Sequence, residues 1–154
     1  MIPVVFKYGG TLDKLIGDAV MAFFGAPIEY KDHAQRAVQA GVEMLEVLKE
    51  IRSSGIKGTE GLDIGVGIAT GDVTLGNLGS DEFLNYTVIG DTVNLASRLE
   101  GLNKTYGTHI LISERTVVQI HGFVLREVGE VVVKGKTTPV KIYELIVKGE
   151  TNAT

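Results

Sequence analysis

The stretch from Leu62 to Thr70 constrains the fold more than any other part of this chain. Aliphatic residues alternate there with smaller or polar ones, in the order Leu-Asp-Ile-Gly-Val-Gly-Ile-Ala-Thr. A period of two predicts a β-strand with one aliphatic face. The other face is nearly bare of side chains, so a backbone, a helix or a ligand must pack closely against it. We therefore expect this strand to lie inside a tightly packed layer.

The residues before this strand predict a hairpin and a long helix. Two apolar runs, 11–16 and 19–24, are separated by Gly17-Asp18, which indicates a β-hairpin. Apolar and small residues then recur at spacings of three and four from Ala34 to Ile51. This spacing predicts an amphipathic helix, for which Asp32 is the candidate N-cap.

The residues after it predict a second hairpin and a second helix. Gly71-Asp72 is expected to turn the chain into a strand over 73–78, and another strand at 86–89 precedes a helix from about Thr92 to Leu102. The expected buried stripe of that helix is Val93, Ala96, Leu99 and Leu102. Further strands and a short helix complete the chain. This order predicts an α+β sandwich, with helices on one face of a mostly antiparallel sheet.

Composition bounds the domain count and the class of function. With 154 residues, 44% hydrophobic and 22% charged, the chain is long enough for one globular domain, which we place at 1–147, followed by a polar tail at 148–154. Its net charge of -4 argues against nucleic-acid binding. The absence of cysteine excludes disulfides. No signal peptide opens the chain and no apolar stretch is long enough to span a bilayer, so we expect no membrane contact by this segment and a cytoplasmic location, within a parent protein that could be anchored elsewhere.

Several polar residues have types and positions suited to binding a phosphorylated ligand. Asp18 is expected at the tip of a hairpin, where its carboxylate oxygens could bind Mg²⁺. Gly-Asp is also a common turn pair, so a purely structural role is the alternative. Asn94 and Arg98 lie four apart and share one helix face, which suits phosphate binding or a solvated surface. Lys14 is expected on the strand face of Leu12 and Ile16, where it either reaches solvent or serves a ligand. Lys134 lies in a glycine-containing loop, where it could meet a phosphate or remain solvated.

Three longer segments together resemble the class III nucleotidyl cyclase family. They read KYGGTLDKLIGDAVMAFFGAP from residue 7, YTVIGDTVNLASRLE from residue 86 and VKGKTTPVKIYEL from residue 133. The resemblance runs from about Val5 to Leu145. It implies a ferredoxin-like catalytic domain that converts ATP or GTP to a cyclic 3′,5′-monophosphate and pyrophosphate. It also implies two divalent cations, Mg²⁺ or Mn²⁺, and a head-to-tail homodimer in which both copies build each site.

The resemblance assigns a role to each candidate residue. Asp18 matches the second metal-binding aspartate. Asn94 and Arg98 match the pair that supports the ribose region and the transition-state phosphate. Lys134 matches the lysine on the terminal phosphates, and Lys14 with Thr87 matches the pair that reads the base. Lys14 can only donate a hydrogen bond and the Thr87 hydroxyl can accept one, which fits adenine N1 and N6, so the pair favours ATP.

One departure from the family pattern bears on activity. The resemblance implies that the domain begins with a strand carrying a first metal-binding aspartate, followed by a first helix, both upstream of Gly9-Gly10. This chain begins after them. We therefore expect little or no cAMP production from the chain alone, and a tendency to abnormal association through uncovered apolar surface. Three alternatives remain open: a non-catalytic cyclase-like module that binds nucleotide or a partner, a guanylate cyclase, and an unrelated α+β domain.

Overall fold

The computed structural model of the chain describes residues 2–16, 19–25, 30–58, 63–77, 86–132 and 138–146. Four helices are found in these ranges: α1 (Ile2–Lys7), α2 (His33–Ser53), α3 (Asp91–Tyr106) and α4 (Glu114–Val117). The strands in the same ranges are β1 (Thr11–Ile16), β2 (Ala19–Phe23), β3 (Val66–Ile68), β4 (Thr74–Asn77), β5 (Tyr86–Ile89), β6 (Ile110–Ser113), β7 (Val124–Val131) and β8 (Val140–Ile146). The expected polar tail lies outside the described residues.

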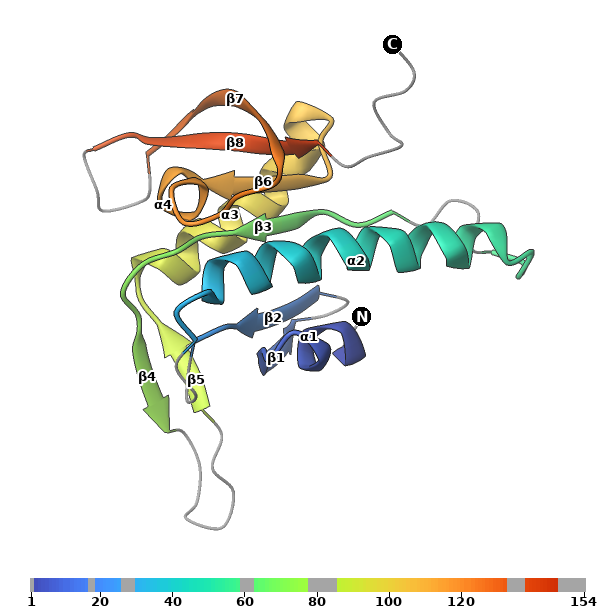
Figure 1. Cartoon of the computed structure of the whole chain (residues 1–154), viewed down its shortest axis with the longest axis horizontal. Coiled ribbons are helices and arrows are strands. Elements are labelled where there is room, and N and C mark those ends of the chain that lie inside the picture. The colour runs from blue at the N-terminus through green and yellow to red at the C-terminus, as the bar shows by residue number, and fades with distance from the viewer. Residues whose placement is uncertain are drawn as a thin grey trace.

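The strands form one four-stranded sheet and two hairpins (Figure 1). The sheet has the order β3-β6-β8-β7, in which β3 runs parallel to β6 and the other neighbours are antiparallel. The hairpin of β1 and β2 confirms the first predicted hairpin. The hairpin of β4 and β5 projects away from the four-stranded sheet. The expected α+β fold of mostly antiparallel strands is confirmed.

The prediction of a hairpin across Gly71-Asp72 is wrong. The strand before this turn, β3, pairs with β6 from much later in the chain, and the strand after it, β4, pairs with β5. Two neighbouring strands joined by a Gly-Asp pair resemble a hairpin locally. Here the same two residues lead the chain out of one sheet and into a separate hairpin.

The core lies on both sides of β6. On one side Leu111 packs with Leu95 and Leu99 of α3, and on the other Ile110 and Ile112 pack with α2. The alternation of side chains along a strand sends neighbouring residues to opposite faces, and each face therefore receives its own helix. The helices therefore cover both faces of the sheet around β6. This layering differs from the prediction, which placed the helices on one face.

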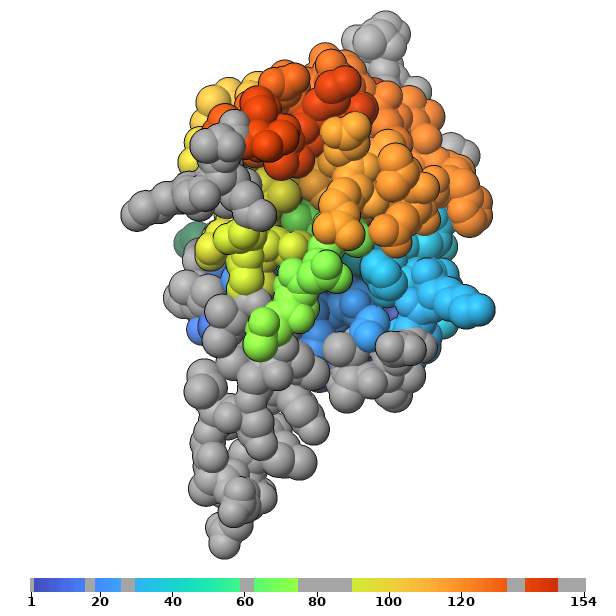
Figure 2. All heavy atoms as spheres, turned by 90° about the vertical axis from the view of Figure 1, so that its left-hand side faces the viewer, coloured from blue at the N-terminus to red at the C-terminus, as the bar shows by residue number. Residues whose placement is uncertain are grey.

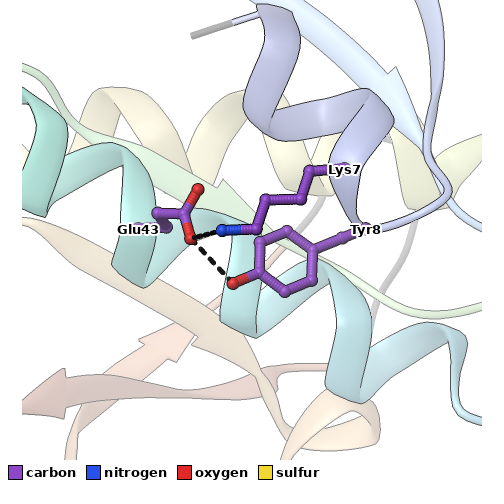
Figure 3. A network of polar contacts seen from close by, with 3 residues as sticks. All are labelled: Lys7, Tyr8 and Glu43. Atoms are coloured by element: carbon purple, nitrogen blue, oxygen red, sulfur yellow. Dashed lines mark hydrogen bonds and ion pairs between the residues drawn. The ribbon is translucent and has the colours of Figure 1, made fainter.

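Helix α2 confirms the long amphipathic helix, and α1 is attached to it by a polar contact. Asp32 occupies the N-cap position, but its carboxylate accepts a hydrogen bond from Arg36 instead of capping the helix. At the end of α1, Lys7 and Tyr8 both donate to the same carboxylate oxygen of Glu43 on α2, at 2.6 and 3.0 Å (Figure 3). The hydrogen bonds from Lys7 and then Tyr8 lower the pKa of the Glu43 carboxyl.

Within the ranges that the structure describes, none of the helices has the length and hydropathy that crossing a bilayer requires.

Candidate active site

Helix α3 lies directly on the backbone of β3, and this contact places the candidate catalytic residues. A Cβ atom added at Gly67 would overlap the backbone nitrogen of Glu100 and the carbonyl oxygen of Ala96. A Cβ at Gly65 would lie 3.1 Å from the carbonyl oxygen of Glu100. The bare face predicted for this strand is therefore confirmed, and the element packed against it is a helix. Glycine at these positions sets how closely the helix approaches the sheet.

A buried amide fixes the far end of α3. The side-chain nitrogen of Asn103 donates to the carbonyl oxygens of Val66, Leu99 and Glu100, at 3.1 to 3.3 Å. Its side-chain oxygen accepts from the hydroxyl of Thr108 at 2.8 Å. Gly107 then ends the helix with φ of 66°, in the left-handed conformation common at C-termini. Asn103 was not predicted as a core residue, because an asparagine interrupts the apolar stripe of the helix.

The buried stripe of α3 is Leu95, Leu99 and Asn103. Of the four residues that we predicted for it, only Leu99 is fully buried, and the prediction that the stripe starts at Val93 is wrong. The helix is rotated relative to the prediction because Asn103 bonds to β3 and pulls its own face inward. Asn94 and Arg98 remain exposed. Their helix face is therefore free to meet a ligand.

Strand β5, which bears Thr87, lies between the start of α3 and β1, which bears Lys14. Thr87 lies in β5, opposite Gly76 of β4, and only its backbone is described. Gly90 separates β5 from α3, and β5 contacts both α3 and β1. On the face seen in Figure 2, the first turn of α3 lies beside the segment that leads into β4, where the Thr92 hydroxyl donates to the carbonyl oxygen of Asp72. The strand of Lys14 and the strand of Thr87 are thus neighbours.

A β-bulge changes the surroundings of Lys14. Leu12 pairs with Ala22 and Lys14 with Met21, so Asp13 is an extra residue in β1. Because Ala22 and Met21 point to opposite faces of the hairpin, so do Leu12 and Lys14. The prediction that Lys14 shares a face with Leu12 is wrong, and the bulge is the reason. The predicted shared face of Lys14 and Ile16 agrees with the register.

The bulge also creates a feature that sequence analysis missed. The side chain of Asp13 is 1% exposed, and within the described residues neither carboxylate oxygen has a hydrogen-bond partner. The Lys14 ammonium lies 3.6 Å from one of these oxygens and is 47% exposed at the side chain. The sequence signal for this feature was the adjacent Asp13 and Lys14 inside an apolar strand. In a regular strand, alternation would send their two charges to opposite faces.

Two candidate residues lie outside the described residues. They are Asp18, which directly precedes the first residue of β2, and Lys134, between β7 and β8. Among the residues that the structure does describe, histidine, aspartate and glutamate form no group of three that could hold a metal ion. The metal and phosphate roles of Asp18 and Lys134 therefore stay predictions.

Comparison with known protein families identifies the domain. A family model described as "Adenylate and Guanylate cyclase catalytic domain" matches residues 9–147. The chain belongs to this cyclase family. The resemblance seen in the three sequence segments is thereby confirmed. The alternative of an unrelated α+β domain is excluded.

Individual cyclases resemble the chain over most of its length. Adenylate cyclase 1 of Rhizobium meliloti is 39% identical over 145 residues, which are 93% of this chain and 22% of the relative. The crystal structure of an adenylyl cyclase from P. aeruginosa has a TM-score of 0.75 at 39% identity and covers 97% of this chain and 78% of its own. A guanylyl cyclase crystal structure has the same TM-score at 36% identity, with 97% of this chain and 76% of that one covered. These likenesses confirm the expected ferredoxin-like cyclase fold.

The cyclase domain is short beside its curated relatives. It spans 22%, 7% and 28% of the length of three adenylate cyclases that it matches. Its sequence therefore corresponds to one region of those proteins.

Proposed function

We propose that this chain is the catalytic domain of an adenylate cyclase, which converts ATP to 3′,5′-cyclic AMP and pyrophosphate in cyclic-nucleotide signalling. The observation that carries the proposal is the contact of β5 with both β1 and α3. These elements bear the base-reading pair and the exposed pair of Asn94 and Arg98. Adenylate cyclases that are 38% to 41% identical to the chain support the same reaction.

In the proposed site, the ends of the nucleotide meet different elements. Lys14 donates to adenine N1 from β1, and the hydroxyl of Thr87 accepts from N6. Asn94 supports the ribose. The guanidinium of Arg98 binds the α-phosphate oxygens of ATP and stabilises the charge that develops on them as the 3′-oxygen bonds to phosphorus and the pyrophosphate oxygen leaves. Lys134 binds the terminal phosphates as a point charge.

Asp18 is the proposed ligand for divalent cations. A carboxylate is the type of oxygen donor that Mg²⁺ and Mn²⁺ accept, and Mg²⁺ sites usually combine one or two protein carboxylates with substrate phosphates. When bound, two such ions would neutralise phosphate charge and polarise the reacting oxygens. The residues of this chain then have to orient the base, the ribose and the phosphates.

We propose in addition that two copies of the domain pair head to tail. The Asn94 and Arg98 face is exposed in the single chain, and so is an apolar pair across the first hairpin: Leu15 is 60% and Val20 38% exposed, and the two are register partners. A second copy would supply the opposite wall of the site, with its Asp18 facing the first copy's Asn94. Sedimentation velocity with and without nucleotide tests the pairing.

Mixing two defective variants tests whether the site is shared. Asp18→Asn damages one half of each site and Asn94→Ala the other half. In a mixed dimer, one site receives both intact halves. The equal mixture should therefore bind Mn²⁺–ATP better than either variant alone. If the mixture only averages the two variants, each copy uses a site of its own.

Nucleotide binding is the first measurement, because it does not require turnover. Calorimetric titration with ATP and GTP in the presence of Mn²⁺ should show tighter binding of ATP. Arg98→Ala should weaken ATP binding at least tenfold, the loss expected for a charge-assisted contact with phosphate. Lys104→Ala, an exposed cation on the same helix, is the matched control and should bind ATP as the parent chain does.

Cyclic nucleotide formation is the second measurement. Since the chain alone is expected to turn over little or no ATP, the identity of any product decides the matter: a low level of cyclic AMP from ATP supports the proposal, and cyclic GMP from GTP would assign the domain to the guanylate cyclases instead. Binding of ATP that survives Arg98→Ala and Asn94→Ala unchanged would remove the proposed site from α3.

A further inference from the structure

The bulge in β1 places two opposite charges together where a regular strand would separate them. Successive residues of a regular strand point to opposite faces. With Asp13 inserted between the pairs Leu12–Ala22 and Lys14–Met21, a carboxylate oxygen of Asp13 lies 3.6 Å from the Lys14 ammonium. Bulges re-aim side chains and are frequent beside active sites. The pair is therefore a product of the bulge.

Asp13 is costly to the fold in its present position. Its side chain is 1% exposed, and both carboxylate oxygens lack a hydrogen-bond partner among the residues that the structure describes. A buried carboxylate without hydrogen bonds costs several kcal/mol unless an opposite charge offsets the lost hydration. The Lys14 ammonium is the opposite charge found beside it in the described part of the chain. The stability of the hairpin alone does not explain an aspartate here.

Lys14 is suited to transmit the effect of Asp13 to a ligand. Its side chain is about half exposed, at 47%, whereas Asp13 is closed off from solvent. A lysine has three donors on a flexible stem and is poorly oriented by itself. A fixed carboxylate on one side restrains the ammonium and leaves other donors free for an acceptor on a ligand. Restraint before binding increases affinity because less side-chain freedom is lost on association.

We propose that Asp13 is a positioning residue that aims Lys14 at the nucleotide base and so sets the preference for adenine over guanine. This proposal rests on the proposed function, in which Lys14 reads the base. Asp13 does not touch the nucleotide; it acts through the ammonium of Lys14. The unfavourable burial of the carboxylate is then a stability cost located at a functional site.

Charge removal without a change of shape tests the proposal. Asp13→Asn should weaken ATP binding roughly tenfold, with GTP binding changed less, because one charge-assisted restraint on Lys14 is lost. The same variant should unfold at an unchanged or higher temperature, since a buried charge is removed. Asp13→Glu should retain part of the ATP preference. Glu50→Gln, the same charge change on the exposed face of α2, is the control and should alter neither quantity.

A double-variant comparison isolates the route through Lys14. In a Lys14→Met background, Asp13→Asn should cause no further loss of ATP affinity, because the group that it positions is gone. An undiminished further loss would overturn the proposal. So would an Asp13→Asn chain that keeps its full ATP preference, or one that loses stability and binding together without recovery in Asp13→Glu.

A readout without nucleotide separates this proposal from the proposed function. The nitrogen resonance of the Lys14 ammonium, measured by NMR in the ligand-free chain, should shift between the parent and Asp13→Asn. If the parent binds neither ATP nor GTP, the proposed function fails, and this shift still decides whether Asp13 positions Lys14. An unchanged Lys14 resonance would refute the positioning role.

Discussion

Replacing Gly67 by alanine should push α3 away from the sheet and destabilise the domain, although only one methyl group is added. The new Cβ would overlap backbone atoms of Ala96 and Glu100 and would lie 3.0 Å from the Cα of Glu100. Backbone atoms cannot swing away as a side chain can, so the whole helix must retreat by roughly 1 Å before the contact becomes ordinary. The hydrogen bond from Asn103 to Val66 would stretch with it.

The size of the effect follows from the same contact. Overpacking a closed interface costs about 1–3 kcal/mol, and an overlap with backbone belongs at the upper end. For a domain of this length, a loss of about 3 kcal/mol lowers the melting temperature by about 6–12 °C. Thermal and urea denaturation, followed by far-ultraviolet circular dichroism, measures the loss. ATP binding should weaken as well, because α3 carries Asn94 and Arg98.

The same helix offers a control of opposite sign. Gly101 lies in α3, and a Cβ added there would have no described heavy atom within 4 Å apart from its chain neighbours and the backbone of its own helix. Gly101→Ala should therefore stabilise the helix by about 1 kcal/mol through helix propensity alone, and raise the melting temperature by about 2–4 °C. The reasoning is refuted if Gly67→Ala is as stable as the parent chain, or if both substitutions move the melting temperature in the same direction.

Three further predictions concern other contacts. Asn103→Ala should cost about 2–4 kcal/mol in urea denaturation, because the Thr108 hydroxyl and the Val66 carbonyl lose their buried partner. Because the contact with α1 lowers the pKa of Glu43, it stabilises the fold above the ordinary carboxyl pKa, and this stabilisation is lost as the pH falls through the lowered value. Glu43→Gln should therefore flatten the acid limb of a stability–pH profile measured between about pH 5 and 3. Lys14→Glu should abolish the preference for ATP over GTP in competition binding, and an unchanged preference would contradict the assignment of Lys14 to the base.

Much of the fold could be predicted because its signals are local. The spacing from Ala34 to Ile51 identified α2, and the two-residue link identified the hairpin of β1 and β2. The bare strand face correctly required a closely packed partner. By contrast, β3 pairs with β6 across more than forty residues, and no spacing in the sequence records a partner so distant. The wrong second hairpin followed from reading a local turn signal as a pairing.

The candidate site could be predicted in part for the same reason. Asn94 and Arg98 share an exposed helix face, as their spacing indicated. The surroundings of Lys14 could not be predicted, because a bulge shifts every later residue of a strand to the other face and has no fixed sequence signal. Asn103 was not predicted because its burial depends on the carbonyl oxygen of Val66, which reaches the side chain only when helix and strand are assembled.

Substitutions on the two faces of α3 should have different effects. The inner face is held by backbone contact at Gly67 and by the amide of Asn103, so its residues determine where the helix lies. The outer face presents Asn94 and Arg98, which are exposed and lie outside the buried stripe. Because position and chemistry are assigned to opposite faces, substitutions on the outer face should change binding with little effect on stability, whereas substitutions on the inner face should change both. Substitution of Asp13 should have a different effect from substitution on the inner face of α3: the fold would gain stability, and the site would lose selectivity.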